Sequence, residues 1–233
     1  MFSGKRGAVA AGHPLTADAA ISILESGGNA FDAVVAATAA AFVCEPVLAS
    51  PGGGGFLTAR PADGKPLVYD FFVQTPATPR PHDESDFYPI VVDFGATQQE
   101  FHIGTAAVAT PGVVKGLFTI HENHGAMPIR ECFSPAIDAA RNGVTLNALQ
   151  AYLNDLISPI LLASEEAKTL FGNQSGAILQ EGDTQRFEQL ADMLDSLALE
   201  GPDLFYRGKV SPAIARQCEK GGHWRRRNLQ ANK

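Results

Sequence analysis

The stretch from Ala30 to Val43 reads AFDAVVAATAAAFV and is apolar on almost every side of the helix that it would form. Asn29 precedes it as a helix cap, and Asp32 lies in the first turn, where a carboxylate stabilises the positive end of a helix. Pro46 ends the segment. A helix without a polar face is surrounded by other elements. We therefore expect the most buried helix of the protein here, with the rest of the fold packed around it.

A second helix is expected just before the buried one, from about Ala17 to Ser26, with Thr16 as its N-cap. Gly27 and Gly28 follow it, and glycine readily adopts the left-handed backbone that ends a helix. These two helices should form a pair.

Strands and then further helices follow this pair. The strands are expected in residues 55–60, 66–73, 89–95, 99–104 and 106–112. The first two flank Asp63-Gly64, a hairpin signal, and a proline-rich extended segment at 75–89 precedes the others. The later helices are expected in residues 113–125, 134–143, 146–163 and 185–201. The order of helix pair, strand group and helix group indicates a layered α+β fold rather than an alternating, doubly wound one.

Composition narrows the classes of partner. The chain has 233 residues, of which 45% are apolar, and this suits one large globular domain. Its net charge of −7 argues against general binding to nucleic acid or to anionic membranes. Three cysteines without paired spacing predict neither a disulfide framework nor a zinc site. No secretory segment or spanning apolar run is visible, so we expect a cytoplasmic protein. We also expect no cofactor.

Four consecutive glycines in SPGGGGFLTA, residues 50–59, are the most unusual local feature. A phosphate-binding loop is disfavoured, because no Lys-Ser/Thr follows and the glycines lead into a strand rather than a helix. Two interpretations stay open. The glycines either let two layers of backbone approach closely, or they form the floor of a catalytic cleft with exposed N–H groups.

The other candidate sites are weaker. His121 and His124 are three residues apart and could share a metal on a helix, but a polar face near a helix C-terminus is the favoured interpretation. No Ser/His/Asp set can be argued from residue order. The run Arg225 to Arg227 could contact nucleic acid, although a solvated chain end is favoured.

Several ordered motifs resemble one family. The segment AGHPLTADAAISILESGGNAFDAVVAATAAAFVCEP, followed by PGGGGF, resembles the opening of the γ-glutamyltransferases, the glutathione hydrolases among the N-terminal-nucleophile hydrolases. DFFVQTP, VATPGVVKGL and EGPDLFYRGKVSPAIARQCEKGG resemble later segments of the large subunit. The resemblance covers residues 6–222. It implies an αββα layered sandwich of the N-terminal-nucleophile hydrolase type, here incomplete.

The resemblance also implies a reaction. Complete relatives cleave γ-glutamyl amides through an acyl-enzyme on a Thr, whose freed α-amine acts as base, and they pass the acyl group to water or an amine. That Thr belongs to a later, smaller subunit, so we expect this chain to carry no catalytic residue and to be inactive alone. Its expected partner is the missing small subunit or C-terminal portion, and an amide substrate would bind only to the completed protein. Gly53, Gly54 and Gly55 would form the cleft floor.

Two departures from the family pattern affect function. The Arg that binds the substrate α-carboxylate in the family falls at Phe72, which carries no charge and cannot donate a hydrogen bond, so a glutamyl substrate is in doubt. After KGGH the family pattern is lost, which suggests a truncated or frame-shifted reading. We therefore expect residues 1–222 to be the N-terminal portion of a large subunit and residues 223–233 an unstructured tail. The alternative is a non-catalytic binding or scaffold protein derived from this family.

Overall fold

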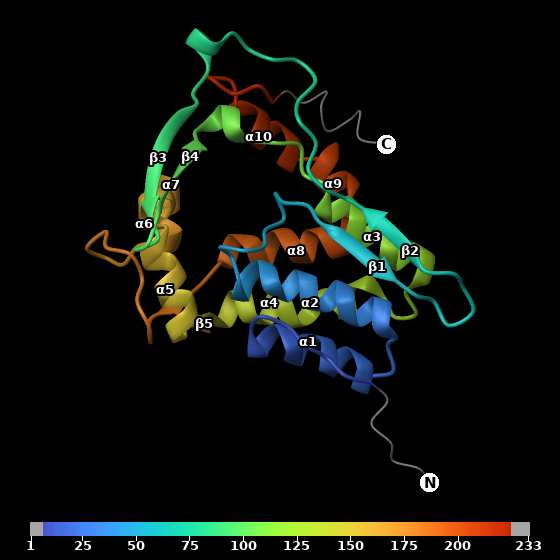
Figure 1. Ribbon diagram of the computed structural model, residues 1–233. Coiled ribbons are helices and arrows are strands. Elements are labelled where there is room, and N and C mark those ends of the chain that lie inside the picture. The colour runs from blue at the N-terminus through green and yellow to red at the C-terminus, as the bar shows by residue number, and fades with distance from the viewer. Residues whose placement is uncertain (1–6, 225–233) are drawn as a thin grey trace.

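The computed structural model describes residues 7–224 (Figure 1). Its longer helices are α1 (Pro14–Glu25), α2 (Ala30–Cys44), α3 (Val113–His124), α4 (Ile129–Asn142), α5 (Ala148–Leu156), α8 (Glu188–Glu200) and α10 (Val210–Gln217). The short helices are α6 (Ser158–Leu161), α7 (Glu165–Phe171) and α9 (Asp203–Tyr206). The strands are β1 (Phe56–Ala59), β2 (Leu67–Asp70), β3 (Tyr88–Asp93), β4 (Gln98–Ile103), β5 (Val144–Thr145) and β6 (Thr184–Gln185).

Helix α2 is the centre of the fold, as its sequence predicted. It packs against α1, α3 and α4, and α8 covers α4 (Figure 1). The capping box is present: Asn29 Oδ1 accepts the Asp32 N–H at 3.1 Å, and Asp32 Oδ2 accepts the Asn29 N–H at 2.8 Å. The paired caps fix where this helix begins.

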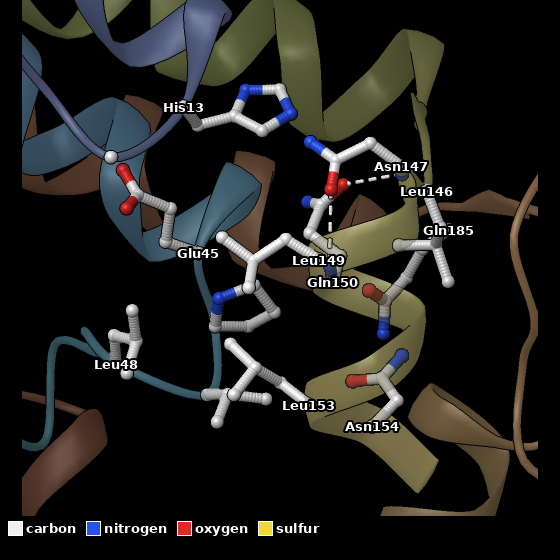
Figure 2. Close-up of a pocket in the computed structure, with 13 residues that line it drawn as sticks. His13, Glu45, Leu48, Leu146, Asn147, Leu149, Gln150, Leu153, Asn154 and Gln185 are labelled. Atoms are coloured by element: carbon white, nitrogen blue, oxygen red, sulfur yellow. Dashed lines mark hydrogen bonds between the residues drawn. The ribbon is translucent and has the colours of Figure 1, made fainter.

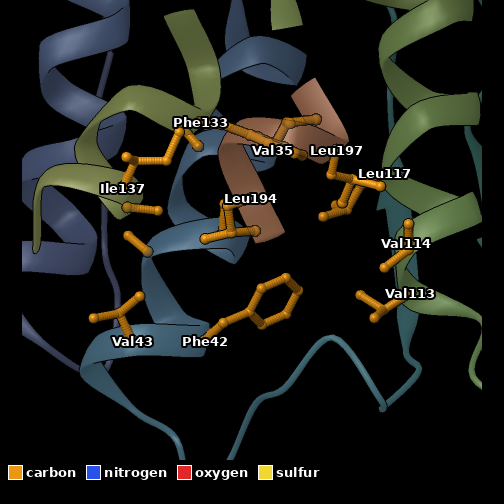
Figure 3. Close-up of a cluster of buried hydrophobic side chains, with 14 of the residues drawn as sticks. Val35, Phe42, Val43, Val113, Val114, Leu117, Phe133, Ile137, Leu194 and Leu197 are labelled. Carbon is orange, nitrogen blue, oxygen red and sulfur yellow. The ribbon is translucent and has the colours of Figure 1, made fainter. Parts of the chain in front are cut away.

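The core lies where these helices meet (Figure 3). Large side chains from α2, α3, α4 and α8 fill it, and burial of each stabilises the fold by about 1.5–3 kcal/mol. They include Val35, Phe42, Leu117, Phe133, Leu194 and Leu197. Alanines such as Ala36, Ala39 and Ala136 are fully buried between them. Their small side chains let the helix axes come close, which explains the many alanines of α2.

The first helix begins earlier than expected. Its N-cap is His13, whose Nδ1 accepts the Leu15 N–H at 3.1 Å, and Pro14 occupies the first helical position. Thr16, predicted as the cap, is instead buried inside the helix and donates from Oγ1 to Glu45 at 2.7 Å. At the other end Gly27 has a φ of +98°, so it ends the helix as predicted, and Gly28 does not need a positive φ.

The strands form three two-stranded antiparallel ribbons in the described part of the chain. In the first ribbon Phe56 pairs with Asp70 and Ala59 with Leu67, so the predicted hairpin is confirmed. β3 and β4 lie where two of the later strands were predicted, and they pair as a ribbon that stands away from the helical core, near α6 (Figure 1). β5 and β6 form a very short third pair.

The strand expected at residues 106–112 is absent. Residues Thr105–Ala107 form a short 3₁₀ turn, and the rest pairs only through an isolated bridge between Thr110 and Gln74. The next residue, Pro111, has no N–H to extend such a ladder. The apolar pattern of this segment reflects burial of Ala106, Thr110 and the residues that follow, rather than a strand.

The second half of the chain is helical, as predicted. The expected helix at 146–163 is divided into α5 and α6 at Ile157, just before Ser158-Pro159, because a proline in the first turn favours a new helix start. The helix expected from residue 134 begins five residues earlier, at Ile129. Within residues 7–224, no helix has both the length and the apolar character that crossing a bilayer requires.

The expected boundary after Gly222 differs from the structure. His223 Nδ1 accepts the Arg80 N–H at 2.9 Å, and the Arg80 side chain donates to the carbonyls of Glu219 and Gly222. Trp224 is fully buried and belongs to the hydrophobic core. His223 and Trp224 therefore belong to the fold, because the indole ring is buried in the core and the imidazole binds the Arg80 backbone. The remainder of the expected tail, 225–233, lies outside the described residues.

Candidate binding groove

The four glycines form a turn that joins α2 to β1. The Gly53 N–H donates to Ser50 O at 3.0 Å, and Gly53 O accepts the N–H groups of Gly112 and Val113 at 3.0 and 3.1 Å. Gly55 exchanges two hydrogen bonds with Phe71, at 3.3 and 3.0 Å. The turn is therefore held on one side by the start of α3 and on the other by the chain that follows β2.

Phe71 explains why glycine is needed here. A Cβ on Gly54 would lie 2.7 Å from Phe71 O and 2.6 Å from Val73 N, and one on Gly112 would lie 2.1 Å from Phe71 O. A Cβ on Gly116 would meet the Phe71 ring at 2.4 Å. These contacts involve backbone or a packed ring, which cannot move aside. Close approach of two backbone layers, one of the two interpretations of the glycines, is thus confirmed.

An open groove of about 330 Å³ lies above this turn. Its walls come from the end of α2, the following loop, β1 and the start of α3, and they include Phe42, Leu48, Phe56 and Phe71. Gly53, Gly54 and Gly55, the residues predicted as a cleft floor, all line it. Their catalytic relevance stays a prediction.

The polar character of the groove comes from neutral groups. None of its 13 described lining residues is charged, and only Thr38 and Ser50 carry hydroxyl groups. The Thr38 hydroxyl already donates to Val34 O at 2.8 Å. Gly54 is exposed, and its N–H donates to no other residue in the described part of the chain. This N–H is available to a ligand.

Phe72 lies beside the groove. Residues alternate along the chain, so Phe71 points into the core and Phe72 points out. The Phe72 ring stacks on Phe56, with centroids 5.4 Å apart and planes inclined by 14°. The two side chains are 52% and 63% exposed, and Phe56 itself lines the groove. The pair is therefore an exposed aromatic surface that extends one wall.

The two predicted histidines do not share a site. His124 stacks on Phe31 at 4.2 Å, and its Nε2 lies 2.9 Å from the Tyr69 hydroxyl. His121 Nε2 lies 2.7 Å from Met127 O. Each ring therefore links α3 to a different neighbour, β2 in one case and the α3–α4 loop in the other.

Asp32, His121 and Cys132 do come together, with possible ligand atoms all within 4.8 Å of one another. A carbonyl such as Met127 O only accepts, so His121 Nε2 carries the proton in this contact and would have to give up this hydrogen bond to bind a metal. Burial, and then the nearby Asp32 carboxylate, raise the pKa of Cys132 to about 12, so this thiol is also protonated.

Asp32 itself is fully buried and accepts backbone N–H groups from Asn29, Ala126 and Met127. Backbone N–H groups and the start of α2 surround it, and both favour an anion over a cation. The geometry of this cluster therefore favours a structural link between α2 and the α3–α4 loop over a metal site.

A second cavity, of about 30 Å³, lies between the start of α1, the loop after α2, and α5 (Figure 2). Buried polar side chains surround it, among them His13, Gln150, Asn154 and Gln185. Gln150 donates to Cys44 O, and Asn154 Nδ2 has no partner in the part of the chain that the structure describes. The volume suits one or two water molecules, so this cavity is too small for an amide substrate.

This chain is similar to known proteins in both sequence and structure. Residues 16–233 match the sequence profile described as gamma-glutamyltranspeptidase. The chain is 33% identical over 220 residues to the glutathione hydrolase proenzyme of Escherichia coli, and 33% identical over 219 residues to the acylase ACY 1 proenzyme of a Pseudomonas species. The crystal structure of Helicobacter pylori gamma-glutamyltranspeptidase superposes with a TM-score of 0.86 at 27% identity.

These matches establish a mixed α+β fold of the N-terminal-nucleophile hydrolase type. The chain belongs to the gamma-glutamyltranspeptidase family. The E. coli alignment covers 94% of this chain and 37% of that relative, and the Pseudomonas alignment covers 91% and 38%. The H. pylori superposition covers all of this chain and 66% of that one. The chain thus corresponds to the N-terminal part of its relatives, as expected.

Several residues that shape the groove were not predicted from the sequence. Gly112 and Gly116 accommodate Phe71, but they follow the glycine turn by about sixty positions, and no local pattern links them to it. The stacking of Phe56 on Phe72 could have been found, since the predicted hairpin places residues 56 and 70 opposite each other and position 72 follows on the same face.

Proposed function

We propose that this chain forms one wall of the substrate cleft of an amide-cleaving, acyl-transferring enzyme of the gamma-glutamyltranspeptidase family. A C-terminal portion would supply the nucleophilic Thr. Its hydroxyl would attack the amide carbonyl, the amine would leave with a proton, and water or a second amine would then accept the acyl group. The chain alone would be inactive.

One observation carries the proposal. The family match includes the glycine turn, and Gly53, Gly54 and Gly55 of that turn line an open groove of about 330 Å³. That volume is in the range of small-molecule sites. The unused Gly54 N–H is a donor of the kind that stabilises charge on a carbonyl oxygen. A non-catalytic binding or scaffold role has no comparable support.

A chimera tests this proposal. The matching N-terminal segment of the E. coli glutathione hydrolase proenzyme is replaced by the present chain, and the product is analysed in two steps. We expect the chimera first to cut itself into two polypeptides, which shows that the two portions assemble, and then to cleave an acyl anilide. A chimera that cuts itself but releases no aniline from γ-glutamyl or other acyl anilides would contradict the proposal.

Phe72 bears on the substrate of such an enzyme. The family resemblance aligns it with the Arg that binds the substrate α-carboxylate, so we propose that the glutamyl group lacks that contact here. In the chimera, Phe72→Arg should increase turnover of γ-glutamyl anilide by about tenfold or more, because an Arg–carboxylate pair is a strong, bidentate interaction. Phe72→Lys is the matched control: it restores the charge without the paired donors, and a smaller gain is expected.

A further inference from the structure

We propose that the groove at Gly53–Gly55 binds an uncharged, aromatic acyl amide, such as a phenylacetyl amide. This inference names the substrate class of the proposed function and rests on it. Three properties of the groove lead to this proposal: its lack of charged side chains, its aromatic wall and the free N–H of Gly54.

The groove has no charged lining residue in the described part of the chain, and this disfavours a carboxylate ligand. No described residue that lines the groove is ionisable, so a bound carboxylate would lose hydration without gaining a cation. A neutral ligand avoids that cost. The hydroxyls of Thr38 and Ser50 and the backbone of the glycine turn can still satisfy one or two polar atoms of an amide.

The aromatic wall favours a ring. Phe56 and Phe72 lie in an offset stack with 63% and 52% of their side chains exposed, which leaves outer faces for a third ring. Offset stacking at this spacing is the arrangement that aromatic rings prefer. Phe42 and Phe71 also line the groove. A flat hydrocarbon ring therefore gains contact on more than one side.

The free N–H orients the ligand. Gly54 is exposed and its N–H has no partner in residues 7–224, so this N–H can donate to an acyl carbonyl. With the carbonyl at Gly54 and the ring toward Phe56, a phenylacetyl group spans the groove. The volume of about 330 Å³ is near the lower end of the range for small-molecule sites, and it suits a ligand of this size better than a long peptide.

Binding is measured by NMR on the isotope-labelled full chain, following the amide signals of Gly53, Gly54 and Gly55. Phenylacetamide is the neutral aromatic probe, and phenylacetate and L-glutamine are the charged ones. We expect phenylacetamide to shift the glycine signals at lower concentration than either charged probe. Phe72→Ala should weaken its binding about fivefold, the size expected for loss of one aromatic contact.

Phe94→Ala is the matched control. Phe94 is 38% exposed and contacts Phe101 beside the β3–β4 ribbon, away from the groove. We expect unchanged affinity for this variant. The proposal is overturned if either charged probe binds more tightly than phenylacetamide, if Phe72→Ala binds as well as the original chain, or if Phe94→Ala weakens binding equally.

The chimera separates this inference from the proposed function. Faster cleavage of phenylacetyl anilide than of γ-glutamyl anilide supports both. Faster cleavage of the γ-glutamyl compound refutes the aromatic substrate and leaves the amide-cleaving function intact. If the chimera assembles and cleaves neither compound while phenylacetamide still shifts the glycine signals, the catalytic function fails and the aromatic site stands. If the assembled chimera no longer binds phenylacetamide, the C-terminal portion fills the groove and the inference fails.

Discussion

Replacing Asp32 by alanine should lower the free energy of unfolding by about 3–5 kcal/mol. The carboxylate accepts the Asn29 N–H at 2.8 Å, the Ala126 N–H at 3.0 Å and the Met127 N–H at 3.3 Å. Each hydrogen bond to a charged group contributes about 1.5–3 kcal/mol, and water entering the space left by the side chain recovers part of the total. Since small domains are stable by only about 5–15 kcal/mol, the loss is easily measured.

Urea unfolding of the full chain tests this value. Trp224 is the single tryptophan of the sequence and is fully buried, so its fluorescence reports the transition. Asp32→Asn keeps the shape of the side chain and one acceptor oxygen. We expect it to lower the free energy of unfolding by about half as much as Asp32→Ala. Asp18→Ala removes an exposed carboxylate from α1 and should change stability by no more than about 0.5 kcal/mol. If Asp32→Ala stays within 1 kcal/mol of the original chain, roughly the worth of one neutral hydrogen bond, the structural role assigned to this carboxylate is wrong.

Three further predictions concern Gly112 at the start of α3, the buried Tyr206 hydroxyl and the buried Cys132 thiol. Gly112→Ala should cost about 1–3 kcal/mol, because its Cβ would lie 2.1 Å from a backbone oxygen, whereas Gly52→Ala, with 3.6 Å to the nearest atom, should melt like the original chain. The buried Tyr206 hydroxyl donates to a carbonyl and accepts a backbone N–H, both at 3.1 Å, so Tyr206→Phe should cost about 1–2 kcal/mol in urea unfolding; an unchanged midpoint would rule out this contribution. Burial raises the pKa of Cys132 from its usual 9.0 to about 12, so the unfolded chain loses this proton first as pH rises. Stability should therefore fall between pH 9 and 12, and Cys132→Ala should make that fall shallower; an identical slope would contradict the assignment.

Local signals in the sequence predicted the elements whose ends are set by neighbouring residues. The capping box of α2 and its uniformly apolar surface are both local, and the helix was placed to within a residue at each end. The cap of α1 was missed because histidine is an uncommon cap, although its ring nitrogen accepts the same N–H. The strand at residues 106–112 was wrong because alternation alone cannot show that a segment lacks a partner strand.

The candidate groove was predictable only in part. Four glycines in a row left close backbone packing as one of two interpretations, and the structure shows that packing where Gly54 meets the backbone of Phe71. The partners that complete it, Gly112 and Gly116, depend on a contact between distant segments, which a single sequence does not encode locally. The role of Phe72 in choosing a substrate stays a prediction, because it depends on an alignment with relatives and not on the stacking of Phe72 on Phe56.

The buried Trp224 has a consequence for the order in which the fold can form. Translation runs toward the C-terminus, so α1, α2 and their neighbours emerge long before the Trp224 ring. Until that ring arrives, the space that it fills is open to solvent, and the Arg80 backbone lacks its acceptor on His223. The helical core can therefore begin to assemble during synthesis, but it closes only after translation has passed residue 224.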